Sequence, residues 1–173
     1  LLQNRTLTLF GEINQDVARR MAEKLLALAF ESDDPITLYI GSPGGHVESG
    51  DTIFDLIRYI KPEVRIIGTG WVGSIATHIY LAADKDNRFA LPNTRFLIHQ
   101  PSGGFGGDAA DIEIHAREIL KTRERINGII AERTGQSIDR VGEDTQRDYW
   151  MSAEESVEYG LVGKIISDIS EVG

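Results

Sequence analysis

The chain has 173 residues, 41% of them hydrophobic, and a formal net charge of −9 at pH 7. This length and composition predict a single domain with a buried core, spanning residues 1–173. The acidic balance argues against nucleic acid or an anionic membrane as a partner. The lack of cysteine excludes disulfides, a thiol nucleophile and thiolate metal sites.

The first half of the chain alternates expected strands and helices. Apolar and β-branched runs predict strands at 6–10, 36–40 and 64–67. Apolar residues at helical spacing predict helices over 15–30, from the glycines at 44–45 to about 60, and over 75–83. This order predicts an α/β fold, a right-handed βαβ series on a largely parallel sheet. We expect the glycines at 68, 70 and 73 to break the third strand.

The second half holds further expected strands and a long helix. The remaining elements are strands at 89–91, 95–99 and 164–166, and helices at about 109–133, at 137–147 and from Ser152, where a capping box begins, to Gly160. The helix at 109–133 spans roughly 37 Å at 1.5 Å per residue. That length leaves two interpretations open: a helix packed on its own core, or an arm that packs between subunits.

Ser74 lies where the expected third strand turns into a helix. Such a turn exposes a side chain, and the unpaired N–H groups of a helix N-terminus stabilise negative charge. This placement favours a nucleophile with donors for an oxyanion beside it. The alternative is an ordinary serine that caps the helix.

Four histidines compete for the role of general base. His99 ends an apolar strand, where α/β sites gather, and is preferred. His78 is the rival, because it follows Ser74 by four residues on one helical face. His46 is placed to line a pocket, and we expect His115 to be solvated on the long helix.

The remaining parts of a hydrolytic site are less specific. A base needs an orienting carboxylate, and Asp148 is one candidate among many acidic residues. Glycines at 44 and 45 let the backbone approach a ligand closely. Their loop and the N–H of Ile75 would form a two-donor oxyanion hole. The sequence has no GxSxG elbow, phosphate loop or metal-ligand spacing, so we expect no cofactor and no metal.

Many of these segments together resemble those of ClpP, the proteolytic subunit of the ATP-dependent Clp protease. The resemblance runs in order along nearly the whole chain. It is carried by Ser42-Pro43-Gly44-Gly45, Lys61-Pro62, Gly73-Ser74, Leu91-Pro92-Asn93, Ile98-His99-Gln100-Pro101, Asp111 to Leu120, Thr134-Gly135-Gln136-Ser137, Arg147-Asp148 and Glu158-Tyr159-Gly160-Leu161-Val162.

The resemblance implies a fold, an activity and site residues. The fold is the ClpP/crotonase-like βαβ spiral, with the helix at about 109–133 as a protruding handle. The activity is that of a serine endopeptidase with Ser74 as nucleophile, His99 as base and Asp148 as the orienting carboxylate. Gly45 and Ile75 supply the oxyanion donors.

The resemblance also implies partners. Two heptameric rings would stack into a closed chamber, with Arg147 at the contact between rings. A strand containing Gly103, Gly104 and Phe105 would pair with unfolded polypeptide. A hexameric AAA+ unfoldase, which spends the ATP, would dock at Tyr39, Tyr59 and Phe89. We expect a cytoplasmic protein.

Several positions depart from the family pattern. This chain has Gly41 where the family usually has Asn, and His78 where it commonly has an aromatic residue. Before Ser74 it has Trp-Val-Gly at 71–73 in place of Gln-Ala-Ala, and after Ser74 it has Ile-Ala at 75–76 in place of Met-Gly. We therefore expect a divergent paralogue that is weak alone and active in rings mixed with a second ClpP type. The alternatives are a non-catalytic ring subunit and a crotonase-like acyl-CoA enzyme that does not depend on Ser74.

Overall fold

The computed structural model describes residues 2–99 and 107–173. Its strands are Thr6–Phe10 (β1), Ile36–Ser42 (β2), Val64–Gly73 (β3), Arg88–Ala90 (β4), Arg95–Ile98 (β5), Tyr149–Met151 (β6) and Lys164–Ile165 (β7). Its α-helices are Gln15–Glu31 (α1), Val47–Tyr59 (α2), Ile75–Tyr80 (α3), Ala109–Thr134 (α4), Ile138–Thr145 (α5) and Ala153–Tyr159 (α6). Short 3₁₀ turns cover Leu2–Asn4, Lys85–Asn87 and Ile169–Val172.

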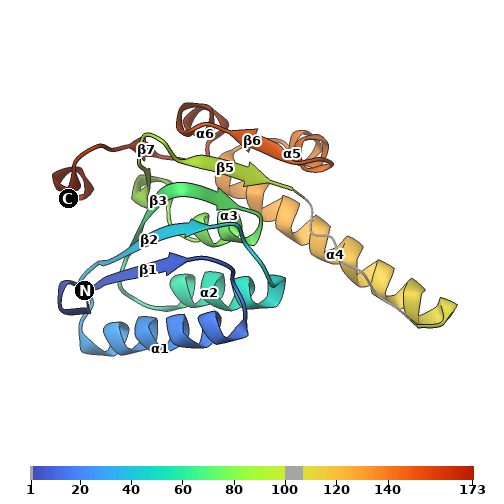
Figure 1. The fold of residues 1–173 in the computed structure, drawn as a ribbon, viewed down its shortest axis with the longest axis horizontal. Coiled ribbons are helices and arrows are strands. Elements are labelled where there is room, and N and C mark those ends of the chain that lie inside the picture. The colour runs from blue at the N-terminus through green and yellow to red at the C-terminus, as the bar shows by residue number, and fades with distance from the viewer. Residues whose placement is uncertain (1, 100–106) are drawn as a thin grey trace.

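Within the described residues, the strands form one mixed sheet. Its order is β1-β2-β3-β4-β7, with β5 paired to both β3 and β6. All pairs are parallel except β5 with β6. Figure 1 shows α1 and α2 lying side by side below β1 and β2, whereas α5, β6 and α6 lie at the opposite end. The predicted α/β architecture with a largely parallel sheet is confirmed.

Strand β3 differs from its prediction in an informative way. We expected the glycines to end it near Ile67, but the strand continues to Gly73. The register with β2 shifts between Ile40 and Ser42, and Gly70 adopts a φ of 64° inside the irregularity. Glycine tolerates this left-handed conformation, so the strand bends rather than stops. The prediction that the glycines break the strand was wrong.

Because β3 bends, it pairs with two different strands along its length. Its first part pairs with β4 and its last part, up to Gly73, pairs with β5. Strand β6, a three-residue strand that pairs antiparallel with β5, was not predicted. So short a strand has no measurable hydrophobic period. Together these two features bring the ends of β3, β5 and β6 to one place.

Helix α4 extends beyond the body of the molecule, as Figure 1 shows in gold. Near its C-terminal end, Ile126 and Ile130 are buried against the core. Towards its start, Ile112, Ile114 and Leu120 are exposed. The expectation of a long protruding helix is therefore confirmed. Among the residues described, no helix combines the length and the apolar character needed to cross a membrane.

Arg88 ties the last third of the chain to β4. Its side chain is buried and donates hydrogen bonds to the carbonyl oxygens of Leu161, Ala83, Arg133 and Gly160, at 2.7–3.0 Å. Burial lowers the pKa of Arg88 to about 10, so the guanidinium stays charged at neutral pH. One side chain thus holds the ends of α4 and α6 and the segment after α3.

We predict that Arg88→Met lowers the free energy of unfolding by about 4 kcal/mol or more, because four carbonyls lose a buried donor. Urea unfolding followed by circular dichroism measures this loss. The control is Arg19→Met, which removes only exposed ion pairs on α1 and should cost less than about 1 kcal/mol. Equal losses for the two variants would contradict the prediction.

Candidate active site

Ser74 lies between β3 and α3 in a strained backbone conformation. Its φ is 58° and its ψ is −127°, and its side chain makes no capping hydrogen bond to α3. Ser74 thus occupies the N-cap position of α3, but its hydroxyl does not cap the helix. Its N–H donates to the carbonyl of Leu97, so the ladder between β3 and β5 continues into the turn. Strain of this kind costs about 1–3 kcal/mol and is typical of functional positions.

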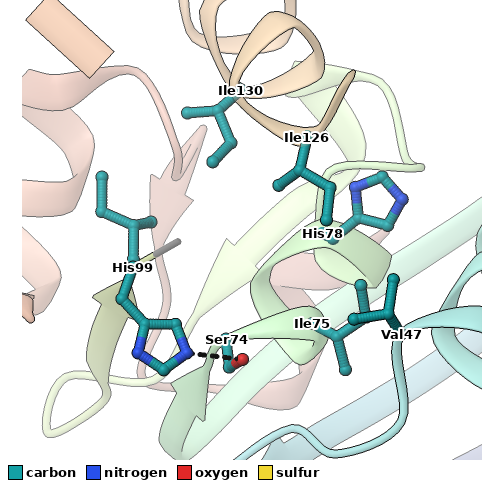
Figure 2. A pocket seen from close by; sticks show the side chains of 8 residues that line it. Val47, Ser74, Ile75, His78, His99, Ile126 and Ile130 are labelled. Atoms are coloured by element: carbon teal, nitrogen blue, oxygen red, sulfur yellow. Dashed lines mark hydrogen bonds between the residues drawn. The ribbon is translucent and has the colours of Figure 1, made fainter. Parts of the chain in front are cut away.

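His99 approaches Ser74 because β3 and β5 end side by side. Gly73 pairs with Leu97 in the parallel register, and His99 follows two residues later. His99 Nε2 lies 2.8 Å from Ser74 Oγ (Figure 2). The imidazole is thus within hydrogen-bonding reach of the hydroxyl, as a general base must be.

Asp148 reaches the other side of the same ring through the strand that sequence reasoning missed. Ile98 pairs with Tyr149 in the antiparallel register of β5 and β6, so His99 and Asp148 are the next residues outward. Asp148 Oδ1 lies 3.0 Å from His99 Nδ1. We assign the proton to Nδ1, which donates to the carboxylate and leaves Nε2 free to accept from Ser74.

The other histidines lie elsewhere. His78 is buried in a stack against Phe54, with ring centroids 4.3 Å apart. His46 Nδ1 lies 2.7 Å from the hydroxyl of Ser49 on α2. His115 lies in the exposed part of α4. In the described residues, His99 is the histidine that hydrogen-bonds Ser74.

The backbone beside Ser74 offers donors for an anion. Ile75 is the first residue of α3, so its N–H has no helical acceptor. The loop at Gly44 packs against the turn so closely that a Cβ on Gly44 would lie 2.7 Å from Ser74 Cβ. Gly45 forms a bridge to Ile13, in which the flanking groups Gly44 C=O and His46 N–H bond Ile13. In a parallel bridge the N–H of Gly45 itself then points away from Ile13.

A small apolar pocket opens beside the hydroxyl. Its volume is about 20 Å³, close to the space of one water. Figure 2 shows Ile126 and Ile130 reaching into this region from α4, opposite Ser74 and His99. The remaining lining residues are Val47, Ile75, His78 and Ile98. A serine, imidazole and carboxylate linked in this order, beside free N–H groups and an apolar pocket, can activate a hydroxyl for attack on a carbonyl.

A protein-family model described as Clp protease matches residues 1–168. The chain belongs to the Clp protease family. Members of this family are serine endopeptidases, and the predictions of family, fold and enzyme class are confirmed.

Curated relatives extend this similarity over the whole chain. Proteolytic subunit 3 of the ATP-dependent Clp protease of Rhizobium meliloti is 54% identical over 99% of this chain and 88% of its own length. Proteolytic subunit 2 from Pseudomonas aeruginosa is 52% identical, with 99% and 85% covered. The solved structure of ClpP1 from Listeria monocytogenes has a TM-score of 0.91 at 49% identity, covering 99% of this chain and 96% of that one.

The other predicted functional residues of this Clp protease chain fall in three places. Tyr39 and Phe89 lie on one row across the sheet, because both pair with Ile67 from either side. Phe89 is buried there with Ile67, and Tyr39 packs against them, whereas Tyr59 is exposed at the end of α2. Arg147 is exposed beside Asp148. The predicted substrate strand at 103–105 lies outside the described residues.

Sequence reasoning missed two side chains that hold the site in shape. Thr77 Oγ1 donates to the carbonyls of Val72 and Leu97, which fastens α3 to β3 and β5. Ser42 Oγ donates to Gly11 O at 2.6 Å and accepts from Gly44 N–H, which fixes the glycine loop. The sequence marked these two residues only by their nearness to glycines, because Ser42 lies just before Gly44 and Thr77 lies four residues after Gly73.

Proposed function

We propose that this chain is a peptidase subunit in which Ser74 attacks the substrate carbonyl, His99 is the general base and Asp148 orients His99. The single observation that carries the proposal is the unbroken hydrogen-bonded series from Ser74 Oγ through His99 to Asp148, with separations of 2.8 and 3.0 Å. The N–H groups of Gly45 and Ile75 are the proposed oxyanion donors.

The proposed reaction follows from these positions. His99 Nε2 takes the proton of Ser74 as Oγ bonds to the peptide carbonyl carbon, and the negative oxygen accepts from the two N–H groups. The imidazolium then protonates the leaving amine as the C–N bond breaks, which leaves an acyl-enzyme. Water, deprotonated by His99, attacks the ester, and the carboxylic acid product leaves as Ser74 regains its proton.

The pocket beside Ser74 supports a preference at the residue whose carbonyl is attacked. Its walls are aliphatic, from Val47 and Ile98 and, on α4, Ile126 and Ile130. Burying an apolar side chain there is favourable by about 25 cal/mol per Å². Because the pocket is only about 20 Å³, we infer that small apolar side chains are preferred at this position over charged ones.

We further propose that the chain forms one peptidase domain that assembles, in the cytoplasm, into two stacked heptameric rings fed by a hexameric AAA+ Clp ATPase. Support comes from relatives named as subunits of an ATP-dependent protease, some numbered 2 or 3. Those numbers also support rings shared with a second ClpP type. The exposed apolar residues of α4, Ile112, Ile114 and Leu120, would pack against the other ring, near Arg147. Tyr39, Tyr59 and Phe89 are the proposed ATPase contacts, and the segment 103–105 is the proposed substrate strand.

The hydrogen-bonded series favours catalysis over a purely structural ring subunit, which needs no such alignment. It also favours a peptidase over a crotonase-like acyl-CoA enzyme, for which Ser74 would have no partner at His99. Native mass spectrometry with a fluorogenic peptide assay tests the proposal, on the pure chain and after mixing with a second ClpP type. We expect ring-sized particles that cleave the peptide; particles that never cleave it, alone or mixed, would overturn the proposal.

Gly44→Ala tests the contact between the glycine loop and the nucleophile. Gly44 has a φ of 101°, and its Cβ would displace Ser74 or the proposed donor at Ile75. We expect kcat to fall about 100-fold, the loss typical of one oxyanion donor. The matched control is Gly142→Ala on α5, where the Cβ meets nothing within 4 Å and activity should be unchanged. A Gly44→Ala enzyme with more than half of the wild-type kcat would contradict this role of the loop.

A further inference from the structure

Three helices around the proposed site are joined by one polar cluster that the reaction itself does not use. It consists of His78 on α3, Asp51 on α2 and Arg125 on α4. These residues are far apart in sequence, and Arg125 and Asp51 are separated by 74 positions. The cluster adjoins the pocket, because His78 and Ile126, the neighbour of Arg125, line its wall (Figure 2).

His78 is the buried end of the cluster. Its side chain is 1% exposed, and its ring stacks on Phe54 of α2 at an interplanar angle of 15°. Nε2 lies 3.2 Å from Asp51 Oδ1, within ion-pair distance, but neither ring nitrogen makes a well-aligned hydrogen bond with the described residues. The tautomer with its proton on Nε2 places the N–H beside the carboxylate, so the contact is electrostatically favourable.

Asp51 links His78 to the protruding helix. Arg125 donates both terminal N–H groups to the carboxylate, at 2.9 and 2.8 Å, in the two-pronged geometry that fixes orientation as well as distance. Burial by itself would raise the pKa of Asp51, but the close contact with His78 and the hydrogen bonds from Arg125 outweigh it and hold that pKa below its usual range. The carboxylate is therefore ionised, hydrogen-bonded to Arg125 and in close contact with His78.

Helix α3 needs external support, because it has only six residues and short helices are marginal without tertiary packing. Its first N–H, on Ile75, is one of the two proposed oxyanion donors. Gly50, which precedes Asp51 on α2, packs so tightly on Ile75 that a Cβ there would overlap the Ile75 side chain. A movement of α2 would therefore reach the N-terminus of α3 directly, and Arg125 links α4 to α2 through Asp51.

We propose that His78 is a positioning residue, which through Asp51 and Arg125 fixes α3, and with it Ser74 and the Ile75 N–H, relative to the protruding helix α4. The inference rests on the proposed function, and it makes the alignment of the site depend on where α4 lies. Because α4 would contact the other ring, the same three residues would transmit ring contact to the nucleophile.

Two substitutions of His78 separate this role from simple packing. His78→Phe keeps a ring for the stack on Phe54 but removes the N–H, whereas His78→Gln keeps an N–H donor and removes the ring. We expect His78→Phe to lower kcat about tenfold with KM within about twofold of wild type, because a small misplacement weakens the transition state more than substrate binding. His78→Gln should retain more of kcat than His78→Phe; the reverse order is the result for a packing role and would overturn the proposal.

A double-mutant cycle tests the connection to Asp51. His78→Phe combined with Asp51→Asn should be no worse than the more impaired single variant, since both break one link. The control is Asp55→Asn, one turn further along α2 and exposed, which removes the same charge without touching His78 and should leave kcat unchanged. Strictly additive losses in the cycle would overturn the link.

Hydrogen exchange of the α3 amides gives a readout that does not depend on peptidase activity. In His78→Phe and Asp51→Asn we expect these amides to exchange about tenfold faster than in wild type, because α3 opens more often. Unchanged exchange would overturn the positioning role. A wild-type chain without peptidase activity would instead overturn the proposed function, and the exchange experiment would still decide the role of His78.

Discussion

Ser74→Ala is expected to lower kcat/KM for a fluorogenic peptide by roughly 10⁵-fold or more, because no other group replaces the attacking oxygen. The fold should be retained, since Ser74 Oγ makes no capping bond to α3 and bonds only to His99 among the described residues. Steady-state kinetics measures the loss, and native mass spectrometry checks that assembly is unchanged.

The matched control is Ser170→Ala, which removes an exposed serine hydroxyl from the C-terminal 3₁₀ turn and should leave kcat/KM unchanged. In rings mixed with a second ClpP type, Ser74→Ala should remove the contribution of this chain and leave that of its partner. Mixed rings with full activity after Ser74→Ala would point to a structural subunit instead.

Asp148→Asn is expected to lower kcat by about 10³-fold at neutral pH, because an amide in that place favours the wrong histidine tautomer. An amide N–H can donate to His99 Nδ1, which moves the ring proton to Nε2 and blocks acceptance from Ser74. The Asp148 side chain is 64% exposed in the single chain. Because solvent screens an exposed carboxylate, we expect a smaller fall in kcat than for a triad with a buried carboxylate. Steady-state kinetics of wild type and Asp148→Asn, with kcat and KM measured across a range of pH, gives the size of this loss.

Asp168→Asn is the control for Asp148→Asn, because it neutralises an exposed carboxylate that only caps the last 3₁₀ turn. Its kcat should stay within about twofold of wild type, as surface substitutions usually do. A loss of less than about threefold for Asp148→Asn would show that His99 is oriented by another group.

The positions of Ser74 and His99 in the fold were predictable because their signals are local. A buried apolar run followed by glycines and a helical pattern places Ser74 at a strand-to-helix turn, and the structure has that turn. His99 follows an apolar strand in the same way. Both predictions use periods of two and 3.6 residues, which a single sequence displays directly.

Asp148 could not be chosen from residue patterns, because its position depends on the pairing of β5 with β6. A three-residue strand has no period, and antiparallel pairing between Ile98 and Tyr149 is a tertiary event. The continuation of β3 through Gly70 was missed for a related reason: the bulge becomes visible only against its neighbour β2. For Asp148 the family resemblance supplied what the residue pattern lacked.

The cluster of His78, Asp51 and Arg125 is a second arrangement that residue patterns could not predict. His78 was singled out as a rival base from its spacing to Ser74, but the ring stacks on Phe54 and lies 3.2 Å from the carboxylate of Asp51 instead. Helical spacing relates residues on one helix, whereas these three residues lie on three different helices. Only the packing of α2, α3 and α4 brings them together.

The most direct measurement is the reaction of the assembled protein with a fluorophosphonate, with the adduct located by peptide mass spectrometry. A single adduct on Ser74 is expected, formed about 100-fold more slowly or worse in His99→Gln, because the base that activates the hydroxyl is gone. An unmodified Ser74, or labelling at the same rate without His99, would contradict the account.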